Sequence, residues 1–219
     1  DVWFIQGQAL VEYPHGGTKP LRTLQDPGEY PASCAVSSKT GTLAVANIIS
    51  TSDGPGSISL YEHAKGKPAI VRGTGHFYFI TYDEHDDIFG DGENSGYQFV
   101  LFELPSKSAR IESIALKGAT IEFPGDVQYT GNVLNIGDQD DAVIYESRVK
   151  GTTATVTGHT PLTGAVDIVA YSIYNNRVIC PDAGSADVEV YAYPKGGNPV
   201  KVVTGLSEPT GVVVSAVSK

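Results

Sequence analysis

The stretch Val190-Tyr-Ala-Tyr-Pro-Lys-Gly-Gly, residues 190–197, is one copy of a pattern that recurs along the chain. A second clear copy is Val11-Glu-Tyr-Pro-His-Gly-Gly, and weaker copies begin at Leu60, Leu101 and Ile144. Aligned on Tyr13, His63, Leu104, Ser147 and Tyr193, the copies are spaced by 50, 41, 43 and 46 residues, and the C-terminal remainder plus the N-terminal start adds 39. A period in the forties built from short strands is typical of propeller blades, because one such unit cannot bury its apolar face alone.

Each repeat is expected to hold four strands separated by turn residues, with the repeated phrase at the end of the third. The terminal repeat is split, because its inner strand falls at residues 208–215 and its other three strands fall at residues 2–6, 9–13 and 19–24. In the fourth repeat the inner strand is expected at residues 166–172. Residues 106–117 have a weak helical pattern, but the repeat predicts a strand there. We therefore expect an all-β chain that forms a single β-propeller domain, residues 1–219, of five four-stranded blades. The expected blades span about 31–73, 76–117, 120–158, 164–205, and 206–219 together with 1–27. Pairing of the N-terminal strands with the C-terminal inner strand would close the ring and protect its edges.

The composition excludes several classes of protein. The 25 acidic residues outnumber the 15 Lys and Arg, for a formal net charge of −10, and no cluster of basic residues offers a nucleic-acid surface. No run of about 18 apolar residues predicts membrane insertion. The chain contains no Met, and its start inside a strand pattern indicates a mature or trimmed product. Cys34 and Cys180 fall on different strand types of non-adjacent repeats, so we expect two buried thiols rather than a disulfide.

Several phrases carry a resemblance to a known group. They are Glu12-Tyr-Pro-His-Gly-Gly, Ile88-Phe-Gly-Asp-Gly-Glu-Asn, Gly137-Asp-Gln-Asp, Pro181-Asp-Ala-Gly and Gly205-Leu-Ser-Glu-Pro-Thr-Gly-Val. Together they resemble secreted bacterial NHL-like β-propellers, a group placed loosely with virginiamycin B lyase and the gluconolactonase-type propellers. The resemblance extends over essentially the whole chain and implies a secreted or periplasmic protein, usually without an assigned activity. Longer members carry one more N-terminal repeat, so the chain is either a five-blade form or a trimmed six-blade one. The catalytic histidine motif of the seven-bladed virginiamycin lyases has no counterpart here, so that activity does not transfer.

Polar residues that end the second strand of every repeat are the first candidates for a site. They are Gln6, Asn47, Asp91, Asp138 and Asp182, which we take as candidate ligand-binding residues. In a propeller these strand ends lie on the face where the inner strands begin, and that face adds the candidate metal ligands Asp126, Asp167, Glu208 and Glu122. Converging oxygen ligands suit calcium, and they would also suit a polyhydroxylated ligand. The same residue types cap turns by accepting backbone N–H groups, so turn capping and ion binding both stay open.

His76 is the one histidine expected near the channel mouth, where it could serve as a general base for a lactone or lyase reaction. It has no identifiable partner in the sequence, and a lone histidine is more often structural, so we assign no catalytic residue. The acidic run Asp83-Glu-His-Asp-Asp lacks calcium-loop spacing and is expected to be a solvated turn.

Three functions are compatible with these features. The favoured hypothesis is a secreted, non-catalytic binding or scaffold propeller that presents its channel face to a small ligand, a glycan or a protein partner. The alternative is a divalent-cation-dependent lactonase or lyase with an acidic site at the channel mouth. The third is a structural module of a surface assembly.

Overall fold

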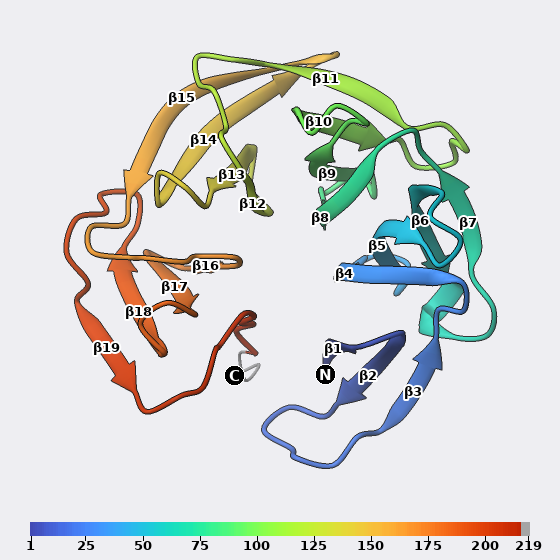
Figure 1. The fold of residues 1–219 in the computed structure, drawn as a ribbon, viewed down its shortest axis with the longest axis horizontal. Coiled ribbons are helices and arrows are strands. Elements are labelled where there is room, and N and C mark those ends of the chain that lie inside the picture. Colours follow the sequence, from blue (N-terminus) through green and yellow to red (C-terminus); the bar gives the residue numbers. More distant parts are fainter. Residues whose placement is uncertain (216–219) are drawn as a thin grey trace. The chain divides into compact units, whose positions relative to one another are not determined.

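The computed structural model describes residues 1–215, which fall into two compact units: residues 1–113 with Ser215, and residues 114–214 (Figure 1). Their secondary structure is almost entirely β, and the short 3-10 helix η1 (Glu62–Ala64) is the only helix within the described range. None of the described residues forms a helix long and apolar enough to cross a membrane. The prediction of an all-β chain is therefore confirmed.

Three antiparallel ladders build the first unit, and within each ladder the strands pair in sequence order. The strands are β1 (Val2–Gln6), β2 (Ala9–Tyr13) and β3 (Arg22–Gln25); β4 (Glu29–Val36), β5 (Leu43–Ser50), β6 (Pro55–Tyr61) and β7 (Ala69–Arg72); and β8 (His76–Tyr82), β9 (Ile88–Glu93) and β10 (Phe99–Leu104). The first two strands occupy the ranges expected from the sequence. The third strands β2, β6 and β10 lie where the recurring phrase places them.

Strand β5 shows why these sheets stack. Its side chains are buried on both faces, since Leu43 and Val45 pack in one apolar cluster with Leu10 and Tyr61, whereas Ala44 and Ala46 join another with residues of β8–β10. A strand that alternates between two clusters must be covered by a sheet on each side. This mutual covering is the reason that one repeat cannot fold alone.

The second unit contains two more antiparallel ladders. Strands β12 (Pro124–Thr130), β13 (Val133–Asp138), β14 (Val143–Lys150) and β15 (Thr153–Pro161) form an antiparallel ladder. Strands β16 (Ser172–Tyr174), β17 (Arg177–Asp182), β18 (Asp187–Ala192) and β19 (Lys201–Thr204) form the other. Their shared core contains Ile144, Leu162, Tyr171, Val178 and Tyr191.

Strand β11 (Glu112–Lys117) has one strand partner that the sequence does not predict. The sequence places it as the outer strand of the second repeat, next to β10, and the strand order agrees. Its residues 115–117 also pair in parallel with residues 153–155 of β15, the outer strand of the next repeat. A parallel partner from another repeat leaves no signal in the local sequence.

Two expected inner strands are absent or reduced. Residues 205–215 contain no strand, so the prediction of a closing strand at 208–215 is wrong. The backbone does not continue as a strand there because Glu208 has φ = 44°, in the left-handed region, and the following proline has no N–H to donate to a ladder. The inner strand expected at 166–172 is reduced to β16. The N–H of Tyr171, just before β16, donates to Asp126 Oδ2 of β12 (3.2 Å), and within β16 the N–H of Ile173 donates to Gln128 Oε1 (2.6 Å).

Candidate functional site

The second-strand ends of the first unit are hydrogen-bonded within their own sheets. Gln6 is exposed at the end of β1, and its amide reaches the Tyr13 hydroxyl at 3.5 Å. Asn47 is fully buried in β5 and donates from Nδ2 to Ser57 Oγ and Ser59 Oγ, both at 3.1 Å. Asp91, buried in β9, accepts the backbone N–H of Phe79 at 3.3 Å.

The corresponding residues of the second unit close turns. Asp138 at the end of β13 accepts the N–H groups of Glu122 (3.0 Å) and Phe123 (3.3 Å). Asp182 at the end of β17 accepts three, from Val166 (2.9 Å), Asp167 (3.1 Å) and Ser185 (3.1 Å). Burial opposes ionisation of Asp182, but these backbone hydrogen bonds outweigh it and lower its pKa below the ordinary value.

The other predicted metal ligands do not gather with these carboxylates. Glu122, Asp167 and Glu208 are exposed, and the first two supply backbone N–H groups to the turns just described. Asp126 on β12 accepts the N–H of Val127 as well as that of Tyr171. Desolvation raises the pKa of Asp126 to about 7, although these two hydrogen bonds oppose the shift.

His76 begins β8 and is half-buried. Its ring lies 5.7 Å from the ring of Tyr97, centroid to centroid. Its cross-strand partner is Glu93, whose carboxylate accepts a hydrogen bond from the Tyr78 hydroxyl. The described residues therefore give His76 neither a nucleophile nor an acid as a hydrogen-bond partner.

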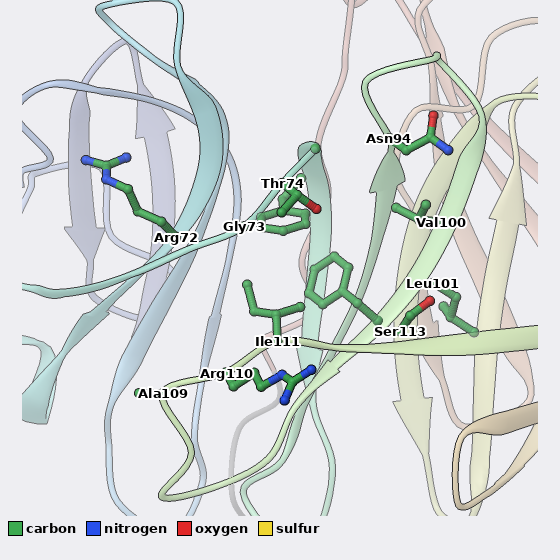
Figure 2. Close-up of a pocket in the computed structure, with 13 residues that line it drawn as sticks. Arg72, Gly73, Thr74, Asn94, Val100, Leu101, Ala109, Arg110, Ile111 and Ser113 are labelled. Atoms are coloured by element: carbon green, nitrogen blue, oxygen red, sulfur yellow. The ribbon is translucent and has the colours of Figure 1, made fainter.

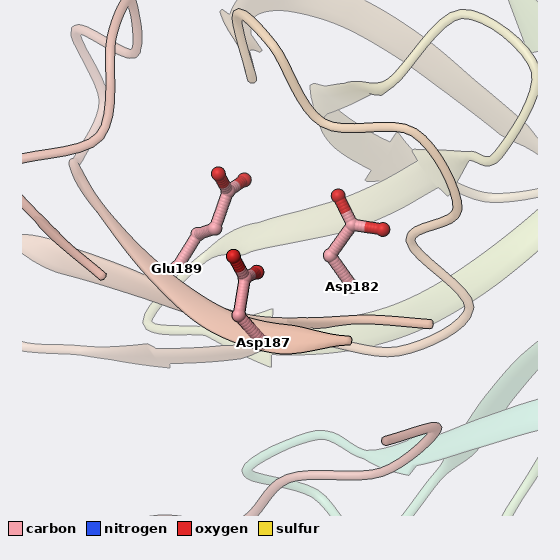
Figure 3. Close-up of side chains that lie close together, drawn as sticks. All are labelled: Asp182, Asp187 and Glu189. Carbon is pink, nitrogen blue, oxygen red and sulfur yellow. The ribbon is translucent and has the colours of Figure 1, made fainter. Parts of the chain in front are cut away.

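A closer group of acids lies in the hairpin of β17 and β18. One carboxylate oxygen from each of Asp182, Asp187 and Glu189 lies within 4.8 Å of the other two, and all three side chains are buried. Figure 3 shows the three carboxylates projecting to the same side of this hairpin. Of these three residues, the repeat pattern predicts only Asp182 as a site residue. The alternation Asp187-Val-Glu-Val was the available signal, because residues 187 and 189 share one face of a strand.

A pocket of about 410 Å³ lies in the first unit. Its floor includes Phe77 and Phe102, whose ring centroids are 4.5 Å apart, together with Ile111. Figure 2 shows Arg110 beside Ile111, whereas the Arg72 guanidinium points away from the other labelled side chains. The residues that line the pocket are Arg72, Gly73, Thr74, Gly75, Phe77, Asn94, Val100, Leu101, Phe102, Ala109, Arg110, Ile111 and Ser113. The lining thus includes two arginines and none of the chain's 25 acidic residues.

Comparison with solved structures supports the fold. The chain aligns with a structure of the nidogen/laminin complex (TM-score 0.69, 14% identity, 95% of this chain and 79% of that one). It also aligns with a functionally unknown protein from Desulfotomaculum acetoxidans (TM-score 0.65, 12% identity, 95% and 66%). The periplasmic gluconolactonase PpgL of Pseudomonas aeruginosa aligns with a TM-score of 0.62 at 14% identity, over 93% of this chain and 64% of that one.

These similarities show an all-β, β-propeller-like fold. The chain spans only about two thirds of the length of the D. acetoxidans protein and of the gluconolactonase. No protein-family model matches the sequence, and no curated protein matches it by sequence. At 12–14% identity the structural neighbours establish the architecture and leave the activity to the residues themselves.

Proposed function

We propose that this chain is a secreted, five-bladed β-propeller that binds a small ligand and catalyses no reaction. The observation that carries the proposal is the pocket beside β10. Its volume of about 410 Å³ falls within the range of small-molecule sites, and it combines an apolar floor with a few polar groups at its rim.

The charges around this pocket indicate the class of ligand. Arg72 is already paired with Glu29, with 2.8 Å between Nη2 and Oε1. Arg110 makes no side-chain hydrogen bond or ion pair among residues 1–215, and its guanidinium lies at the rim of the apolar floor. In a chain with a net charge of −10, a cavity without acids around a free guanidinium favours an anion. A small aromatic or aliphatic carboxylate would place its apolar body on Phe77 and Ile111 and its charge on Arg110.

Titration calorimetry with phenylacetate and with its uncharged analogue phenylacetamide tests this proposal. We expect saturable binding of phenylacetate and at least tenfold weaker binding of the amide, because only the acid forms a charge-assisted hydrogen bond with Arg110. Arg110→Gln should weaken phenylacetate binding to the level of the amide. Arg148→Gln, which removes an exposed arginine in the second unit, is the matched control and should change nothing. Equal affinities of the acid and the amide, or an unchanged affinity in Arg110→Gln, would contradict the proposed ligand class.

A further inference from the structure

The three carboxylates of the β17–β18 hairpin are withdrawn from water. The relative exposure is 0% for Asp182, 9% for Asp187 and 7% for Glu189. Asp182 and Asp187 face each other in the antiparallel register, and Glu189 lies two residues farther along the same face of β18. Three acids that are both buried and within 4.8 Å of one another repel strongly unless a positive charge compensates them.

No side-chain cation provides that compensation in the part of the chain that the structure describes. Its salt bridges join other acids: Glu12 with Arg22, Glu29 with Arg72, and Asp83 with His85. The groups that do contact the cluster are neutral donors, namely backbone N–H groups at Asp182 and the Tyr191 hydroxyl at Glu189. Asp187 Oδ1 is buried with no hydrogen-bond partner at all. This oxygen points to a ligand, because buried polar atoms in proteins are nearly always hydrogen-bonded.

The other repeats lack this arrangement, although each has a polar residue at the same strand end. The residue directly across from that position is Ala9, Ser57, Leu101, Val143 or Asp187 in the five repeats, in chain order. Two residues farther along stand Val11, Ser59, Glu103, Tyr145 and Glu189. In the β4–β7 sheet both of these positions are serines, and Asn47 donates a hydrogen bond from Nδ2 to each of them. Only the repeat of strands β16–β19 places carboxylates at all three positions.

We propose that Asp182, Asp187 and Glu189 form a binding site for a hard divalent cation, specifically calcium. The donor set consists of oxygen alone, which suits calcium and magnesium and disfavours softer metals that prefer nitrogen or sulfur. Oxygens bound at about 2.3–2.6 Å to one calcium ion can be at most about 5 Å apart, and the three carboxylate oxygens lie within 4.8 Å. Three protein ligands leave at least three positions for water or for a bound polyhydroxylated molecule. Magnesium suits the hairpin less, because it demands near-octahedral geometry at about 2.1 Å.

Terbium luminescence and thermal unfolding of the intact chain test this site. Tb³⁺ occupies calcium sites and emits when a neighbouring tyrosine is excited, and the Tyr191 hydroxyl bonds directly to Glu189. We expect sensitised Tb³⁺ emission that calcium displaces. We also expect a melting temperature that rises by several degrees in saturating calcium relative to EDTA and rises less in magnesium.

The variants Asp187→Asn and Glu189→Gln should each weaken calcium binding at least tenfold and suppress the calcium-dependent rise in melting temperature. Both should still fold, because each removes a repelling charge. Asp138→Asn is the matched control: it changes the equivalent strand end of the third repeat and should leave the calcium response intact even where it lowers stability. The proposal is overturned if no divalent ion shifts the melting curve or if both cluster variants respond like the original chain. Tighter binding of magnesium than of calcium would overturn the assignment to calcium.

Discussion

Replacing Asp187 by Asn should stabilise the chain when divalent ions are absent. At an effective dielectric constant of about 20, two ionised carboxylates 4.8 Å apart repel by about 3.5 kcal/mol. Burial is the main cause that raises the pKa of Glu189, the Tyr191 hydroxyl opposes it, and the charges of Asp187 and Asp182 add to it. We therefore expect Asp187→Asn to raise the free energy of unfolding by about 1–3 kcal/mol.

The neighbouring substitution Asp182→Ala should have the opposite sign. Asp182 also carries a repelling charge, but its oxygens accept three backbone N–H groups at 2.9–3.1 Å. Each hydrogen bond to a charged acceptor contributes about 1.5–3 kcal/mol. The loss of three such bonds outweighs the relieved repulsion, so the free energy of unfolding should fall by at least about 2 kcal/mol. A comparison of the two variants therefore separates the effect of charge repulsion on the free energy of unfolding from the effect of turn capping.

Urea unfolding followed by circular dichroism, at pH 7.5 and in EDTA, measures both free energies. The slope of the free energy with urea concentration should stay constant, so that shifts of the midpoint report stability alone. In saturating calcium the order of Asp187→Asn and the original chain should reverse, because only the original chain gains binding free energy. A destabilised Asp187→Asn variant in EDTA would show that the charge of Asp187 is already compensated, which would refute the reasoning.

Three further predictions concern other buried groups. Because burial raises the pKa of Asp126 from 3.8 to about 7, the folded state loses stability as the pH rises between these values. Asp126→Asn should therefore be more stable than the original chain at about pH 8 and less stable at about pH 5. Urea unfolding that gives the same sign of the stability difference at both pH values would contradict this. Asp138→Ala leaves two backbone N–H groups without their acceptor and should cost about 2–4 kcal/mol in the same assay, whereas exposed Asp140→Ala should cost less than about 0.5 kcal/mol. Iodoacetamide should modify half-buried Cys34 before Cys180, because Cys180 is fully buried and burial raises the pKa of its thiol. Mass spectrometry that finds Cys180 modified first would contradict the packing described for the two thiols.

The strands were predictable wherever the repeat and the alternation of apolar residues agree. Strands β1 and β2 match their expected bounds because both carry alternating side chains up to a turn at Gly7 with φ = 62°. The strand prediction for β11 also held against a weak helical pattern, because the period of the repeats outweighs local propensity there. Its additional parallel pairing with β15 could not be predicted, since no local pattern encodes a partner in another repeat.

The inner strand that is reduced in the second unit has a different cause. At residues 166–171 the N–H groups of Val166 and Asp167 donate to Asp182, and that of Tyr171 donates to Asp126, so these side chains take hydrogen bonds that a ladder would otherwise make. In the first unit, too, a side chain accepts the N–H of an inner-strand residue, since the N–H of Ile80 donates to Ser33 Oγ at 3.1 Å. Strand β8 nevertheless keeps its ladder with β9. Whether such a side chain adds to a ladder of backbone hydrogen bonds or replaces it depends on how neighbouring strands are placed, and no local sequence pattern encodes that placement.

The residues of the candidate site likewise could not be predicted from local sequence patterns alone. Residue type and repeat position place Asp138 and Asp182 as equivalents, and both do cap turns. Their surroundings differ because the residue across the register is Val143 in one repeat and Asp187 in the other. The first carboxylate therefore lies against an apolar side chain, and the second lies in a buried cluster of three acids. A search for recurring residues finds what the repeats share, whereas a site arises where one repeat departs from the others. The cross-strand register is what makes that departure visible.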